Sequence, residues 1–234
     1  MTTIQDSRKV SVALVIRLDD FTTGYAITND KMLKIISADG FFLPVIKPDG
    51  YFVFTNHRPE AVRITSDKYQ SVLLSTDNHA GTVLRLSIIS KDYCGNTFTL
   101  DGEAHVGFGG NGAGYFLSSA VTTDFAAITP QKDDLRDITD LYHALISSDG
   151  NAESVFVTKN LGNGQYALQE PPKRDYPARG TRLFPLYRVM GGEIPIPSGV
   201  ETAYILQNGK LTTQAILSHA VIQQQGQPEL EGLA

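Results

Sequence analysis

Hydrophobic and polar residues alternate over short stretches of the first 90 positions, the pattern of β-strands that bury one face. Turn signals separate these stretches; at Pro48-Asp49-Gly50 the proline presets one backbone angle and the glycine takes the positive φ that follows. Across Asp39-Gly40 the pattern predicts two strands joined by a tight turn. The expected strands cover residues 11–18, 34–37, 41–46, 51–54, 61–64, 70–74 and 82–89. This spacing predicts an antiparallel β-sandwich over residues 1–94.

A helical period appears once, between residues 129 and 147. Leu135, Ile138, Leu141, Tyr142, Leu145 and Ile146 recur at three- and four-residue spacing. Thr129 can cap the segment, and Pro130 suits the first helical position. The spacing therefore predicts one amphipathic helix over about 130–147.

The rest of the second half is expected to be β-rich. Asn163-Gly164 and Asn208-Gly209 each lie between apolar segments, which predicts two hairpins with type I′ turns. We place a module boundary near residues 91–97, so that a β-rich region with one helix covers 95–220. The polar residues 221–234 are interpreted as a tail.

Composition limits the function classes. At 234 residues the chain can form one large or two small domains, and its 21 glycines and 11 prolines suit many turns. The net charge of −5 counts against attraction of the whole chain to nucleic acid or anionic membrane. The single cysteine, Cys94, excludes an internal disulfide and a cysteine metal cluster.

The first residues do not show the pattern expected of a targeting signal. Its apolar stretch, residues 10–16, is short and is followed at once by Arg17, Asp19 and Asp20 rather than by a cleavage site. No run approaches the roughly 20 apolar residues that cross a bilayer. We therefore expect a soluble protein that is made in the cytoplasm without a signal peptide and that can be part of a particle.

The first third of the chain resembles a known family. The resemblance rests on Arg17-Leu-Asp-Asp-Phe-Thr-Thr-Gly24, Lys47-Pro-Asp-Gly-Tyr-Phe-Val-Phe54, Pro59, Val62-Arg-Ile64 and Tyr69. Residues 11–75 are similar to carboxypeptidase regulatory-like domains, which are transthyretin-like β-sandwiches, although Lys68 stands where that family usually has glycine. The resemblance implies a sandwich that stabilises or binds other proteins, and it brings no catalytic residue with it.

Glycines and aspartates in the second half supply two candidate ligand sites. Residues 107–112 match the spacing of a dinucleotide-binding loop, but no βαβ context surrounds them, which favours a loop or a glycine-containing strand. Asp133, Asp137 and Asp140 share one face of the predicted helix, which favours a solvated face over a calcium site. We assign neither a cofactor nor a metal.

Catalytic constellations are also missing from the sequence. The five histidines form no zinc-hydrolase spacing, Cys94 has no histidine nearby, and no Gly-x-Ser-x-Gly motif occurs. We therefore assign no catalytic residue and predict that the chain is not an enzyme.

The segment from 171 to 188 concentrates positive charge in an acidic chain. Five basic residues oppose only Asp175, for a local charge of +4, and two tyrosines are interleaved. Arginine and tyrosine are enriched at protein interfaces and also bind single-stranded nucleic acid, and a solvated loop is the third interpretation. As candidates for a protein interface we take Lys173, Arg174, Tyr176, Arg179, Arg182, Tyr187 and Arg188.

These observations favour a non-enzymatic structural or adaptor protein that docks into a larger assembly. Its partners would be other protein subunits or further copies of the chain, and phage tails and contractile particles are the analogy. One alternative is a carbohydrate-binding module, which the ten tyrosines favour and the absence of tryptophan weakens. Another is an enzyme with a dispersed site around His105, Asp124 or His143.

Overall fold

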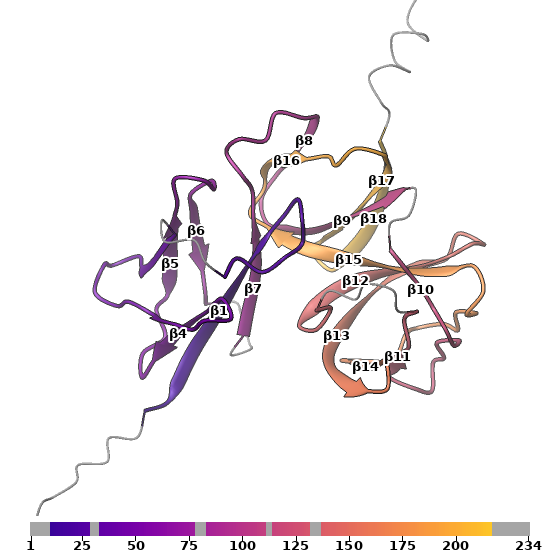
Figure 1. Ribbon diagram of the computed structural model, residues 1–234. Coiled ribbons are helices and arrows are strands. Elements are labelled where there is room, and N and C mark those ends of the chain that lie inside the picture. Colours follow the sequence, from indigo (N-terminus) through magenta and orange to yellow (C-terminus); the bar gives the residue numbers. More distant parts are fainter. Residues whose placement is uncertain (1–9, 29–32, 78–82, 111–113, 132–136, 217–234) are drawn as a thin grey trace, which may run out of the picture.

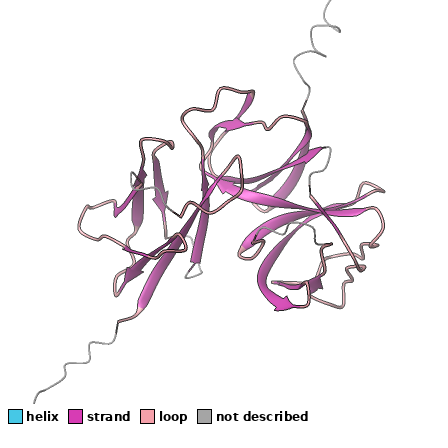
Figure 2. Ribbon diagram, in the orientation of Figure 1, coloured by secondary structure: helices cyan, strands magenta, loops and turns pink. Residues whose placement is uncertain are grey.

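The computed structural model describes residues 10–28, 33–77, 83–110, 114–131 and 137–216, and over these residues it contains strands and no helix (Figures 1 and 2). The prediction of a mainly β chain is confirmed. The strands are β1 (Val12–Asp20), β2 (Lys34–Ser37), β3 (Val45–Ile46), β4 (Tyr51–Thr55), β5 (Ala61–Thr65), β6 (Val72–Ser75), β7 (Val83–Ile88), β8 (Thr97–Leu100), β9 (Ala104–Gly110), β10 (Tyr115–Phe116), β11 (Ala127–Ile128), β12 (Leu141–Ser147), β13 (Ala152–Gly162), β14 (Gln165–Leu168), β15 (Thr181–Val189), β16 (Gly192–Pro195), β17 (Val200–Gln207) and β18 (Lys210–Ala215).

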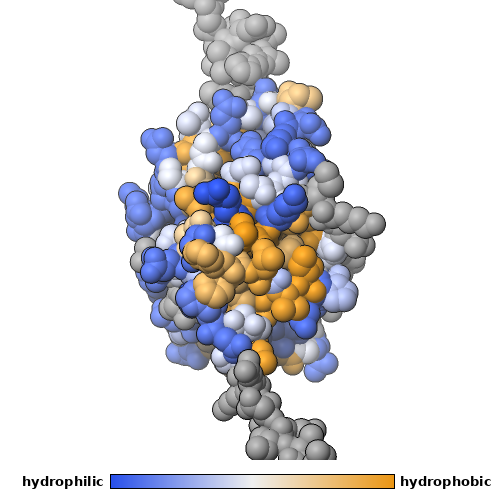
Figure 3. Space-filling model, turned by 90° about the vertical axis from the view of Figure 1, so that its left-hand side faces the viewer, coloured by the Kyte–Doolittle hydropathy of each residue, from blue (hydrophilic) through white to orange (hydrophobic). Residues whose placement is uncertain are grey.

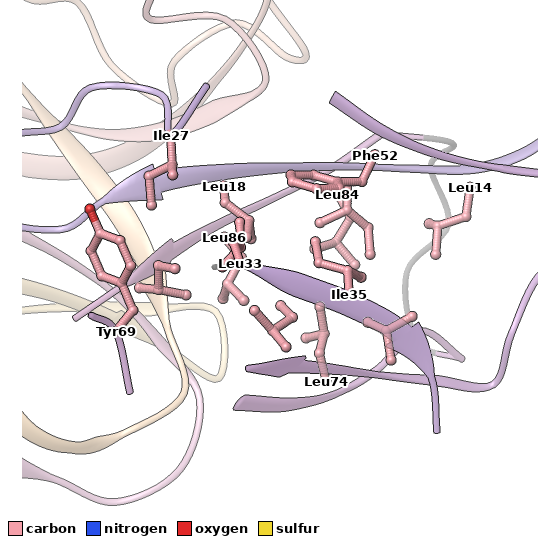
Figure 4. Close-up of a cluster of buried hydrophobic side chains, with 14 of the residues drawn as sticks. Leu14, Leu18, Ile27, Leu33, Ile35, Phe52, Tyr69, Leu74, Leu84 and Leu86 are labelled. Carbon is pink, nitrogen blue, oxygen red and sulfur yellow. The ribbon is translucent and has the colours of Figure 1, made fainter. Parts of the chain in front are cut away.

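Two sheets make up the first part of the chain, with strand orders β3-β4-β1-β7 and β2-β5-β6. Alternate residues of their strands form one buried apolar cluster, in which Leu14 of β1, Ile35 of β2 and Leu74 of β6 take part (Figure 4). Burial of these side chains is the main force that holds the two sheets together.

Strand pairing in this first part differs from the prediction in two ways. Residues 34–37 and 41–46 do not form a hairpin, because β2 pairs with β5 while β3 pairs with β4. The pairing is also not wholly antiparallel, since β1 runs parallel to β7. Both differences come from contacts between distant segments, which the local alternation of residues does not encode.

The second part is built on one long sheet with the order β11-β14-β13-β12-β15-β9-β17-β18, to which β10 adds through β15, and on the small sheet β16-β8. The long sheet curls so strongly that β13 comes into contact with β18. Phe21 and Ile89 of the first part are buried against Val106 of β9 and Val189 of β15, so apolar packing joins the two parts.

The predicted helix over about 130–147 is wrong for the residues that the structure describes. Residues 132–136 lie outside that set, but 141–147 form β12, which pairs with β13 on one side and β15 on the other. Asp140 adopts a φ of +53°, which a helix does not allow. Leu141 and Leu145 are buried on one face of the sheet and Ala144 on the other. A strand that is buried on both faces is apolar throughout, and such an apolar run also fits the spacing of a helical stripe.

The turn predictions of the second half are confirmed. Asn163 and Gly164 have φ of +51° and +77°, and Asn208 and Gly209 have +50° and +73°, as a type I′ turn requires at both central positions. These turns join β13 to β14 and β17 to β18.

Candidate protein-docking surface

A run of large apolar side chains lies exposed on the first part of the molecule. Phe41, Leu43 and Ile46 are 82%, 74% and 65% exposed, and Phe42 and Val45 are also exposed. We call residues 41–46 the apolar ledge. Hydrophobic side chains gather into a patch on the face of the molecule that carries this first part (Figure 3). Contiguous apolar patches of several hundred Å² on a protein surface usually mark interaction sites.

The turn before the ledge holds its backbone in place. The Asp39 carboxylate accepts a hydrogen bond from the Phe41 amide at 3.0 Å and another from the Ser37 hydroxyl. The Ser37 hydroxyl in turn accepts from the Phe42 amide at 2.8 Å, and the Ser37 amide donates to the Phe42 carbonyl at 3.0 Å. The bonds from Ser37 and Phe41 lower the pKa of Asp39, so the carboxylate stays charged. The start of the ledge, at Phe41 and Phe42, is therefore held in place within the chain itself, which reduces the entropy cost of binding a partner there.

The apolar surface continues onto the outer face of the neighbouring sheet. Val45 of β3 lies opposite Val53 of β4, and Val53 lies opposite Val15 of β1, so these three valines share a face. Although β3 is the edge strand of its sheet, prolines at positions 44 and 48 limit backbone pairing there. The surface therefore offers side chains rather than a free strand edge.

The other end of this outer face is covered from within the chain. Arg85 of β7 forms a buried ion pair with Asp19 of β1 and donates hydrogen bonds to the carbonyls of Asp137 at 3.0 Å and Thr139 at 2.9 Å. Arg17 adds an ion pair to the Asp137 carboxylate. The segment before β12 thus caps the polar end of the sheet and leaves the valine end uncovered.

The pKa values of the two aspartates in this cap are shifted in opposite directions. Burial opposes ionisation of Asp137, but hydrogen bonds from Thr139 and Arg17 outweigh burial and lower the pKa of that carboxyl. Burial, together with the neighbouring Asp137 charge, raises the pKa of Asp140. The predicted shared helix face of Asp133, Asp137 and Asp140 is not observed, since Asp133 lies outside the described residues and Asp137 is engaged with Arg17.

The interface candidates predicted from the basic segment do not form one continuous exposed surface. Lys173, Arg174 and Arg179 are exposed in the loop before β15. Tyr176, in contrast, is buried in the apolar cluster that also contains Val121. A buried Tyr176 cannot take part in surface contacts in this conformation.

The remaining three candidates lie within β15 and are partly covered. Arg182 stacks its guanidinium over the rings of Phe116 and Phe184, Tyr187 packs edge-on against Phe21, and Arg188 pairs with Glu103. All three side chains are only partly exposed, so local sequence composition overstated their availability.

The fold does not bring His105 and His143, the histidines of the catalytic alternative, together. His143 is fully buried, and because the adjacent Tyr142 packs on His105, the two histidines lie on opposite faces of the sheet. Asp124 is exposed in a loop, and Cys94 is exposed as a free thiol. Within the described ranges no group of three or more histidine, cysteine, aspartate or glutamate side chains is placed to hold a metal ion.

The glycine-rich segment contributes to packing rather than to a cofactor loop. Residues 107–110 form the end of β9, and a Cβ at Gly107 would lie 2.3 Å from the Pro185 carbonyl oxygen. Glycine there lets β9 approach β15 closely. For residues 107–110 this agrees with the interpretation of the segment as a glycine-containing strand, while residues 111 and 112 lie outside the described ranges.

Comparison with protein-family models, with curated proteins and with solved structures found no match to this chain. The resemblance to carboxypeptidase regulatory-like domains therefore stays a prediction. In the part of the chain that the structure describes, no helix has the length and apolar character needed to cross a membrane.

Proposed function

We propose that the chain is a non-enzymatic structural or adaptor protein that docks into a larger protein assembly through the apolar ledge. The observation that carries this proposal is the exposure of Phe41, Leu43 and Ile46 next to a turn in which Asp39 and Ser37 hold the backbone of Phe41 and Phe42. Exposed apolar side chains of this size are unfavourable in water, and burial against a partner removes that cost.

The occupant that fits the ledge best is an uncharged apolar surface of a different subunit. Residues 41–46 include no charged side chain, so a charged partner surface would lose its hydration without compensation. Their exposed fractions correspond to roughly 600 Å² of surface, below the about 800 Å² per partner of a standard stable interface. The ledge is thus suited to be one contact among several, as in a multi-subunit particle, rather than the whole interface of a stable dimer.

Two other features of the chain support this role. The two sheets that share one core are what the predicted regulatory-like sandwich would contain, and such modules commonly act as interaction domains beside other units. Lys173, Arg174 and Arg179, exposed in their loop, would supply contacts at a separate surface. A phage-tail-like or contractile particle remains the example of such an assembly, by analogy.

Affinity purification of the full chain from its source cells tests the proposal, with each co-purified protein then produced in pure form and rebound to the chain. The test variant combines Phe41→Ser and Leu43→Ser. The matched control combines Phe125→Ser and Leu161→Ser, which remove two exposed apolar side chains away from the ledge.

We expect a stoichiometric partner whose affinity falls at least tenfold for the ledge variant and stays within twofold for the control, because buried apolar anchors dominate interface energetics. Equal affinity of the two variants for the purified partner, or recovery of the chain alone under native conditions, would contradict the proposal.

A further inference from the structure

A hollow of about 410 Å³ lies on the second part of the molecule, away from the ledge. It forms because the long sheet curls, so that the turn between β17 and β18 approaches β12 and β13. Its lining comprises Glu103, Ala104, His105, Tyr142, Ser154, Leu206, Gln207, Asn208 and Gly209. The volume falls within the roughly 300–1,000 Å³ of small-molecule sites, which often occur where curved sheets leave an open mouth.

Aromatic rings make one wall of this hollow. The His105 and Tyr142 rings meet edge to face with centroids 4.8 Å apart, and Tyr142 meets Phe156 in the same way, also at 4.8 Å. Each ring thereby fixes the orientation of the next. Buried Leu206 adds an aliphatic surface. Together His105, Tyr142 and Leu206 give the hollow a largely apolar wall, and Phe156, which lies outside the lining, packs against Tyr142.

The charged groups of the hollow are compensated from within the chain. Arg188 Nε lies 2.8 Å from one Glu103 carboxylate oxygen, and Arg188 Nη2 donates to the other at 2.9 Å. The Gln207 amide donates to the carbonyls of Asp101 at 2.6 Å and Glu103 at 3.2 Å, which fixes the rim. Burial and the nearby Arg188 lower the pKa of His105 to about 4, so its ring is neutral at pH 7. The site therefore carries no uncompensated charge among its described groups.

The remaining polar groups are neutral and can both donate and accept hydrogen bonds. They are the Tyr142 and Ser154 hydroxyls and the Asn208 amide. Neutral hydrogen-bonding groups beside an aromatic wall match a ligand that has hydroxyl groups on its rim and C–H groups on its faces.

We propose that this hollow binds a neutral, polyhydroxylated ligand, such as one or two sugar rings. Anionic sugars fit less well, because the Glu103 carboxylate lies in the lining and its arginine partner is already engaged. This inference is independent of the docking role, since the hollow shares no residue with the ledge.

Titration of the full chain with a panel of sugars, followed by two-dimensional NMR, tests the inference. The neutral probes are glucose, galactose, mannose, N-acetylglucosamine, maltose and lactose, and the anionic probes are glucuronate and glucose 6-phosphate, each up to about 100 mM. Tyr142→Phe removes only a hydroxyl. Asn208→Gly removes the amide but keeps a residue that suits the positive φ of that turn. The control is Asn163→Gly, the same change in the other type I′ turn.

We expect at least one neutral sugar to bind, and each of the two pocket variants to weaken that binding roughly 2- to 10-fold, the usual effect of one lost hydrogen bond. Asn163→Gly leaves the affinity unchanged. The inference is overturned when no neutral sugar in the panel binds, when both pocket variants bind as well as the control, or when the anionic probes bind more tightly.

Discussion

Two histidines, His143 buried and His105 half-buried, show how single residues in this sheet depart from their ordinary chemistry. His143 is fully buried, its Nδ1 lies 3.1 Å from the Leu141 carbonyl, and its Nε2 has no hydrogen-bond partner in the described part of the chain. Burial lowers the pKa of His143 to about 3, and burial with the Arg188 charge lowers that of His105 to about 4. Both rings are therefore neutral in the folded protein at pH values where the unfolded chain already protonates them.

The free energy of unfolding is expected to fall as the pH decreases from 7 to 4.5. The unfolded chain takes up protons near pH 6.5 while the folded chain does not, so acid favours the unfolded state. Replacement of His143 by leucine should remove part of this dependence, of the order of 2–3 kcal/mol over that range. Urea unfolding at a series of pH values measures the effect, with His57→Gln at an exposed site as the control. An unchanged pH slope in His143→Leu would show that the account of this residue is wrong.

At the scale of elements, β9 depends on a close approach to β15 that only glycine permits. An added Cβ at Gly107 would lie 2.3 Å from the Pro185 carbonyl oxygen and 2.8 Å from a Leu186 methyl carbon, so the two strands would have to separate. β9 also pairs with β17, and a displacement of β9 would therefore disturb both of its neighbours.

Gly107→Ala is expected to lower the free energy of unfolding by about 2–4 kcal/mol, because the added methyl group meets backbone that cannot move freely. The control, Gly164→Ala, has open space around the new methyl and is opposed only by its φ of +77°, which costs about 1 kcal/mol. Chemical denaturation of the three proteins compares these effects. Equal losses in both variants would refute the idea that strand contact, rather than backbone conformation, requires Gly107.

The elements also show what the sequence could and could not predict. Strands with one buried face and the Asn-Gly turns followed from local alternation and from the φ angles that asparagine and glycine tolerate. β12 could not be predicted in this way, because a strand that is buried on both faces lacks the alternation by which strands are recognised. Only the pairing of β12 with β13 and β15 shows that it is a strand.

The candidate site was harder to predict than the strands. Residues 41–46 were expected to be a strand, but nothing local indicates that β3 begins only at Val45 and leaves Phe41 and Leu43 outside it, exposed to water. Conversely, the charge of the segment around Tyr176 suggested an open surface, while the fold buries that ring. Exposure depends on contacts between distant segments, and one sequence does not display them.

At the scale of the whole molecule, apolar packing, the hydrogen bonds of Arg85 and the ion pair of Arg17 with Asp137 link the two parts. Phe21 and Ile89 extend the apolar core across the junction, and Arg85 reaches from β7 to the carbonyls of Asp137 and Thr139. Loss of one partner of a buried ion pair such as that of Arg85 with Asp19 typically costs about 3–5 kcal/mol. With the two parts linked in this way, the ledge is exposed on the first part. The hollow near His105 lies on the second part and shares no residue with the ledge.

Hydrogen–deuterium exchange of the chain, alone and bound to its purified partner, tests the docking role most directly. Our account predicts that binding slows exchange of the backbone amides in residues 41–46 and in the adjacent β4, and leaves the β17–β18 turn unchanged. Unaltered exchange across the ledge in the bound state, with protection confined to the loop that holds Lys173 and Arg179, would contradict it and would place the interface on the basic segment instead.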